Sequence, residues 1–300
     1  LFDDYTTRGP QMKTQELTID RHMGYAFDFK VRELKNEPTL QYIRDSWLMA
    51  MAEMDSEQRA TWEAIYDKKN EEFLKNPSVG KDLLRWKYQR YVKEYCRTIR
   101  SVDEQVGRLL DYLEEKGVLD NTVIVYTSDQ GFLLGEHGLY DKRFMYEESF
   151  RTPLIISCPS LVKKHSVCKE LVQNIDLAPT FLSLAGVEVP KEMSGRSLLP
   201  LFKNGKAENW RNELYYHFYD YPAVGSVRKH DGIRTKRYKL IHWHGEGSGN
   251  DEAIDFWELY DLKKDVMEVN NVYDNPKYVK VREALTVQLE KLRKDVGVTE

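Results

Sequence analysis

The longest regular pattern in the chain is an amphipathic repeat between Lys81 and Lys116. Charged side chains fill one face, and apolar side chains recur at steps of three and four residues on the other, at Tyr88, Val92, Tyr95, Ile99, Val102, Val106, Leu109 and Leu113. This spacing predicts one long helix, which Gly117 is suited to end. A second helical stretch from Thr39 to Lys75 is interrupted near Asp55, where a short polar side chain can cap a new helix.

Short apolar runs follow the long helix. Residues 122–127 are β-branched and aromatic, which is typical of a strand buried on both faces, and residues 153–157 predict a second buried strand. Helix, turn and buried strand in this order favour one repeat of an α/β parallel sheet. Residues 176–185 predict a short helix. Residues 1–35 show little periodicity and predict an extended segment that follows the surface.

The pattern changes after Leu201. Residues 214–219, 232–234, 238–243 and 258–262 predict short strands of an antiparallel meander, and residues 277–294 predict an amphipathic closing helix. We therefore expect an α/β portion over residues 1–201 and a smaller α+β subdomain with an antiparallel sheet over residues 202–300.

Composition limits the possible partners. The 300 residues suffice for one large domain or two modest ones. A net charge of −4 provides no large basic field to attract nucleic acid. No apolar run approaches the roughly 18–20 residues of a membrane-spanning helix. Three cysteines have the spacing of neither a zinc motif nor a disulfide framework.

Candidate chemistry begins where the first predicted strand ends, at Ser128-Asp129-Gln130-Gly131. Ligands of open α/β sheets bind outside the carboxyl ends of the strands. The Asp129 carboxylate and the Gln130 amide oxygen are hard ligands of the kind that calcium prefers. The alternative interpretation of the same residues is a plain turn or a helix cap.

The stretch from Tyr126 to Ile156 resembles the type I sulfatases of the alkaline-phosphatase-like superfamily. Residues 85–95, 174–182, 195–201 and 232–241 match further landmarks of this family in the same order, so the resemblance covers nearly the whole chain. It is strongest to bacterial N-acetylglucosamine-6-sulfatases and arylsulfatases that act on sulfated glycans. The resemblance implies a mixed or parallel alkaline-phosphatase-like sheet between helices. It also implies a periplasmic or secreted sulfuric ester hydrolase with a sulfated sugar or glycan as substrate.

The resemblance also implies site residues. Type I sulfatases bind calcium with two early Asp residues and a later Asp next to an Asn, His or Gln, and the later pair matches Asp129 and Gln130. Lys142 matches the lysine that contacts the sulfate, where a fixed cation stabilises charge developing on the sulfate oxygens. His137 is a weaker candidate whose alternative role is to order its loop. The candidates for substrate contact in the C-terminal subdomain, each with the alternative of an ordinary strand residue, are His217 first and then Tyr219, His230, His242 and His244.

The family nucleophile is a formylglycine, made from Cys or Ser within Cys/Ser-x-Pro/Ala-x-Arg. Residues 96–100 have Thr in the middle position, and residues 157–161 end in Leu, so neither segment fits. We therefore expect this chain alone to be inactive and to bind calcium weakly, with part of the ligand set. The missing N-terminal half, about 150–200 residues, is expected either in a longer form of this protein or in a partner chain. Two alternatives stay open, a phosphonate or phosphate monoester hydrolase of the same superfamily and a non-catalytic sugar-binding fragment.

Overall fold

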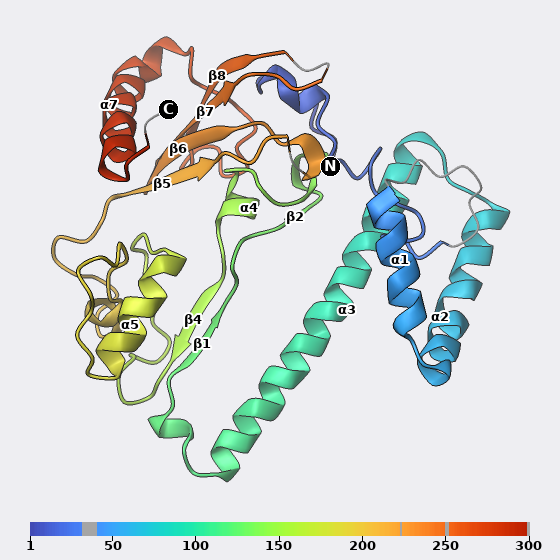
Figure 1. Cartoon of the computed structure of the whole chain (residues 1–300), viewed down its shortest axis with the longest axis horizontal. Coiled ribbons are helices and arrows are strands. Elements are labelled where there is room, and N and C mark those ends of the chain that lie inside the picture. The colour runs from blue at the N-terminus through green and yellow to red at the C-terminus, as the bar shows by residue number, and fades with distance from the viewer. Residues whose placement is uncertain (32–40, 223, 250–251, 299–300) are drawn as a thin grey trace. The chain divides into compact units, whose positions relative to one another are not determined.

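The computed structural model describes residues 1–31, 41–222, 224–249 and 252–298 (Figure 1). Its contacts divide the chain into two compact units, which are described separately. Unit 1 contains Leu1–Asp3, Gln15–Leu109 and Leu133–Asp141. Unit 2 contains Asp4–Thr14, Leu110–Phe132 and Lys142–Glu300. The predicted boundary near residue 201 stays a prediction.

The helices of unit 1 follow the predicted pattern. α1 (Gln41–Glu53) and α2 (Ser56–Lys75) are separated at Asp55, and α3 (Gly80–Glu115) is the long helix that the repeat predicts. The Asp55 carboxylate accepts hydrogen bonds from the backbone N–H groups of Glu57 and Gln58, and the Gln58 side chain accepts the Asp55 N–H. This capping box satisfies N–H groups that the helix itself leaves unpaired. Thr39, the predicted first residue of the stretch, lies outside the described residues.

The prediction of a surface-following segment for residues 1–35 was wrong for the part that the structure describes. Ile19, Met23, Phe29 and Val31 are buried and form a core cluster with Phe73 of α2. Irregular backbone gives no periodic signal, so burial of its side chains cannot be recognised from sequence spacing. Residues 32–35 lie outside the described residues. Unit 1 also contains β2 (Leu133–Leu134) and β3 (Tyr140–Asp141), which pair antiparallel.

The predicted strands after α3 are present, but their pairing and burial differ from expectation. β1 (Ile124–Thr127) pairs antiparallel with β4 (Leu154–Ser157). A parallel pair needs a long crossover, usually a full helix, and the connection here contains only α4 (Glu147–Phe150) as an α-helix. Tyr126 and Ile155 are 41% and 62% exposed, so these strands are not buried on both faces.

The C-terminal meander and its helix are confirmed. β5 (Glu213–Phe218), β6 (His230–Thr235), β7 (Tyr238–Gly245) and β8 (Ile254–Asp261) form an antiparallel sheet in that order. α7 (Val279–Asp295) lies beside this sheet (Figure 1), and its Leu285 and Leu289 pack with Ile233, Leu240 and Leu259. This apolar layer holds the meander together.

Unit 2 also contains two short α-helices, α5 (Leu177–Leu184) and α6 (Leu199–Phe202). Buried Asp176 precedes α5 and accepts hydrogen bonds from the Arg196 backbone and the Arg211 guanidinium. In the described part of the chain, no helix is long and apolar enough to cross a membrane.

Candidate functional site

The turn that follows β1 carries the predicted metal ligands. Asp129 is exposed and Gln130 is half-buried. The side-chain amide of Asn174 donates to the carbonyl oxygens of Ser128 and Asp129 at 3.1 and 2.9 Å. The Asp129 carboxylate accepts the Gln130 N–H at 3.1 Å. These bonds fix the backbone of the turn and leave carboxylate and amide oxygens from adjacent residues, a donor set that suits a hard cation.

Gly131 attaches this turn to α4. Its N–H donates to the Ser149 carbonyl oxygen at 3.0 Å. A Cβ atom at this position would lie 2.2 Å from the Glu148 carbonyl oxygen and 2.7 Å from that of Arg151. Only glycine allows so close an approach of two backbones. The position of the Asp129–Gln130 turn therefore depends directly on α4.

Lys142 lies on the segment that leads into α4. It is half-buried, whereas Phe144, Met145 and Tyr146 have 0% exposure. Arg143 has a φ of 91°, which is rare for a residue with a side chain. The chain after Lys142 is therefore both strained and anchored in the interior. Through α4, Lys142 and the Asp129–Gln130 turn belong to one connected framework within unit 2.

His137 belongs to unit 1, where its contacts hold a loop in place. It lies in a 3₁₀ turn, Glu136–Gly138, with a φ of 57°. Its buried ring places Nδ1 3.1 Å from a carboxylate oxygen of Asp3. Gly135, with a φ of 121°, allows the same turn to approach the Tyr88 ring. These contacts order the loop, and a role of His137 in substrate binding stays a prediction.

His217 lies on β5 of the C-terminal sheet. Its ring is 5.4 Å from the Tyr219 ring and 6.2 Å from the His244 ring. Its Nε2 atom is buried and has no hydrogen-bond partner among the described residues. His230 is instead completely buried and stacks on Trp243 at 4.2 Å, as an ordinary interior residue of a strand does.

One further group of side chains has the composition of a metal site. Atoms of Asp231, His242 and His244 that can bind a metal lie within 4.8 Å of one another. However, the Arg293 guanidinium donates to both Asp231 carboxylate oxygens at 2.6 and 2.5 Å and lies 3.1 Å from His242 Nδ1. A cation already neutralises the carboxylate, so we assign no metal to this group.

Sequence reasoning missed a buried ionic cluster in unit 2. Lys239 of β7 has 0% exposure, and its ammonium lies 2.9 Å from a Glu147 carboxylate oxygen and 2.7 Å from one of Glu268. Arg234 donates to both Glu147 carboxylate oxygens at 3.3 and 3.2 Å. Burial alone would raise the pKa of Glu147, but Lys239 and Arg234 outweigh it and hold this pKa at about 2. Lys239 occupies an ordinary alternating position in the sequence, and nothing there indicates that carboxylates far along the chain surround it.

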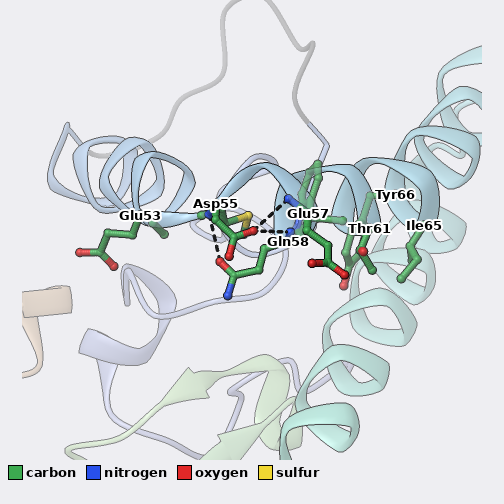
Figure 2. A pocket seen from close by; sticks show the side chains of 10 residues that line it. Glu53, Asp55, Glu57, Gln58, Thr61, Ile65 and Tyr66 are labelled. Atoms are coloured by element: carbon green, nitrogen blue, oxygen red, sulfur yellow. Dashed lines mark hydrogen bonds between the residues drawn. The ribbon is translucent and has the colours of Figure 1, made fainter.

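A surface depression lies elsewhere, against α1 and α2 of unit 1 (Figure 2). Its lining includes Trp62, Tyr66 and the acidic Glu53 and Glu57. Figure 2 shows that Asp55 and Gln58, also in the lining, are joined by the hydrogen bonds of the α2 cap. None of the predicted site residues lines this depression, so we do not place the chemistry there.

Known protein families match the chain over the segments just described. The sulfatase family matches residues 35–187, and the C-terminal region of the N-sulphoglucosamine sulphohydrolases matches residues 135–295. The first match spans β1, the Asp129–Gln130 turn, Lys142 and β4, and covers just over half of the chain. The chain belongs to the sulfatase family. The predicted family, and with it the alkaline-phosphatase-like fold class, is thereby confirmed.

Individual relatives support this sulfatase assignment. An N-acetylglucosamine-6-O-sulfatase of Bacteroides thetaiotaomicron is 45% identical over 296 residues, which are 98% of this chain and 51% of that protein. A solved protein in complex with its substrate D-glucosamine-2-N,6-O-disulfate has a TM-score of 0.88 and 44% identity, over 98% of this chain and 58% of the other. A phosphonate monoester hydrolase from Silicibacter pomeroyi has a TM-score of 0.56 and 27% identity, over 71% of this chain and 41% of the other. The sulfatase chain thus spans about half the length of the relatives that it matches.

Proposed function

We propose that this chain is part of a sulfuric ester hydrolase that removes sulfate from a sulfated glucosamine or a glycan containing it. One observation carries the proposal. The strand-end turn with Asp129 and Gln130 is hydrogen-bonded through Gly131 to α4, and the segment entering α4 carries Lys142. Oxygen ligands for a cation and a lysine for an anion therefore share one framework. The relatives named for 6-sulfated glucosamine support the choice of substrate.

We infer that Asp129 and Gln130 hold part of a calcium site. A calcium ion bound there would neutralise negative charge next to the sulfate ester. Lys142 would contribute a second positive charge, directed at the non-bridging oxygens of the sulfate. An electrostatic contact of this kind lowers the barrier when it is stronger in the transition state than in the bound substrate. The nucleophile that we propose is a formylglycine in the sequence upstream of Leu1.

The second candidate function is hydrolysis of phosphonate or phosphate monoesters, which the similarity to a phosphonate monoester hydrolase favours. A sulfate monoester carries one negative charge and a phosphate monoester about two at neutral pH, so the two substrates place different demands on the same cations. Rates on a sulfate and a phosphate ester with the same leaving group separate the two functions. A tenfold preference for phosphate would replace our proposal by the second candidate.

The decisive experiment uses the full-length protein with N-acetylglucosamine 6-sulfate and measures released sulfate. We expect turnover that is lost on treatment with a calcium chelator and restored by added calcium. Asp129→Asn should lower the affinity for calcium, so that turnover needs a higher calcium concentration, while Lys206→Met, at an exposed position, serves as a surface control. Turnover that is indifferent to the chelator and to Asp129→Asn would refute the metal assignment. Absence of turnover on every sulfated glucosamine would refute the substrate assignment.

We also propose a periplasmic or secreted location for the complete protein, on the basis of its family. Cell fractionation with an antibody to the C-terminal helix tests this location. Recovery of the protein together with a cytoplasmic marker would contradict it.

A further inference from the structure

Residues 143–147, here called the held segment, contact the C-terminal sheet at nearly every position. The Tyr216 hydroxyl of β5 donates to the Arg143 carbonyl oxygen at 3.0 Å. The Lys239 ammonium of β7 donates to the Met145 carbonyl oxygen at 2.6 Å. Two strands of the sheet, β5 and β7, thus bind carbonyl oxygens of the segment that directly follows Lys142.

The other contacts continue along the held segment. The Tyr146 hydroxyl donates to the Glu258 carboxylate of β8 at 3.0 Å, and the Arg8 guanidinium stacks 4.4 Å from the Tyr146 ring centroid. The Glu147 N–H donates to the Glu268 carboxylate at 2.7 Å. Glu268 has 0% exposure and a φ of 50°, so its own backbone is in a rare conformation.

Lys239 and Glu268 are central to this arrangement because each touches both the backbone of the held segment and the other. The Lys239 ammonium lies 2.7 Å from a Glu268 carboxylate oxygen while it also binds Met145. Burying such charges away from water is costly and by itself gives little net stability. This buried ion pair instead favours one backbone conformation, because it binds the Met145 carbonyl oxygen on one side of Tyr146 and the Glu147 N–H on the other.

This fixed backbone conformation matters for Lys142, because the residue next to it is strained. Arg143 adopts a left-handed φ of 91°, a conformation that persists only when its surroundings determine it. Without the contacts at residues 143, 145 and 147, the segment can relax to an ordinary conformation, and Lys142 would move with it. A displacement of about 1 Å in a positioning element can reduce catalysis about 100-fold.

We propose that Lys239 and Glu268 are positioning residues that hold Lys142 in place for sulfate binding by fixing the backbone of residues 143–147. This inference rests on the proposed function, because it assigns a purpose to the placement of Lys142. It extends that function by making the C-terminal sheet a necessary support of the segment that carries Lys142.

The test compares variants of the full-length protein on N-acetylglucosamine 6-sulfate. Lys239→Met alone leaves two buried carboxyl groups without their ammonium and can fail to fold. The neutral pair Lys239→Met/Glu268→Gln removes one charge of each sign and is the principal variant. Arg237→Met is the matched control, since among the described contacts Arg237 pairs with Asp261 and not with the held segment.

We expect the double variant to remain folded and to lose at least about tenfold in kcat, with a smaller change in KM, because the displaced charge acts in the transition state. Arg237→Met should keep kcat within about twofold. If the positioning residues act through Lys142, adding the double substitution to Lys142→Met should lower kcat by less than about twofold further. An unchanged kcat, or an equal further loss in the Lys142→Met background, would overturn the proposal.

Amide hydrogen exchange of the same variants separates this inference from the proposed function. The Glu147 amide should exchange at least about tenfold faster in the double variant, while amides of the β7–β8 pair stay protected. If the wild-type protein lacks sulfatase activity but this difference is seen, the proposed function fails and the positioning of the segment stands. Equal exchange at Glu147 would refute the positioning itself.

Discussion

The completely buried His230 gives the chain a pH dependence of stability that can be worked out in advance. Its Nδ1 lies 2.8 Å from the Arg228 carbonyl oxygen, and its ring stacks on Trp243. Burial lowers the pKa of His230 to about 4, against the opposing effects of the Arg228 hydrogen bond and Asp231 and with smaller lowering effects of His244 and His217. His230 therefore binds a proton near pH 6.5 in the unfolded state but only near pH 4 in the folded state.

The sign and size of the effect follow from this difference. Because the folded-state pKa lies below the unfolded-state value, the free energy of unfolding is unaffected well above pH 6.5. It falls as the pH decreases from about 6.5 towards 4, where only the unfolded state binds the proton. Between pH 7 and pH 5 this single residue should account for about 2 kcal/mol of lost stability.

Urea unfolding followed by tryptophan fluorescence measures this loss in the wild type and in His230→Phe at pH 7 and pH 5. The variant keeps an aromatic ring against Trp243 and cannot titrate. We expect its stability to fall by about 2 kcal/mol less than that of the wild type over this range, since contributions of the other groups cancel in the comparison. A difference below about 0.5 kcal/mol would refute the assignment of this pH dependence to His230.

Further substitutions test other parts of the structure. Gly131→Ala should lower sulfatase activity at least about tenfold, because the added Cβ would lie 2.2 Å from the Glu148 carbonyl oxygen and displace the Asp129–Gln130 turn. A variant as active as the wild type would contradict the attachment of this turn to α4. Arg211→Met should cost about 3–5 kcal/mol in urea unfolding by leaving buried Asp176 without its guanidinium, and a loss under about 1 kcal/mol would show that the pair is dispensable. Asp55→Ala should cost about 1 kcal/mol through loss of the α2 cap, measured by thermal unfolding, and an unchanged melting temperature would count against that cap.

The elements that the sequence predicted well are those with a long or repeated pattern. α3 follows from a repeat of apolar positions, and the C-terminal meander from alternating runs separated by turn residues. The same repeat does not predict how far its apolar side chains are buried. Three of them, Ile99, Val102 and Leu109, are 49%, 44% and 53% exposed. Residues 1–31 were misjudged because their buried side chains, such as Phe29, are carried by backbone without a period.

The residues of the candidate site also differ in whether the sequence alone could predict them. Asp129, Gln130 and Lys142 were found because they lie within contiguous motifs, and the structure places all three on the framework of β1 and α4, while their roles stay proposals. Lys239 and Glu268 were not found, because their importance depends on contacts between residues far apart in the chain. Pairings of this kind are visible only once the fold brings the residues together.

The proposed function depends above all on contact between Lys142 and the sulfate. The most direct measurement is kcat for release of sulfate from N-acetylglucosamine 6-sulfate by the full-length protein and by its Lys142→Met variant, with melting temperatures recorded in parallel. We expect a wild-type enzyme that turns over and a variant that is equally stable but at least about 100-fold slower. A variant as fast as the wild type would contradict this contact.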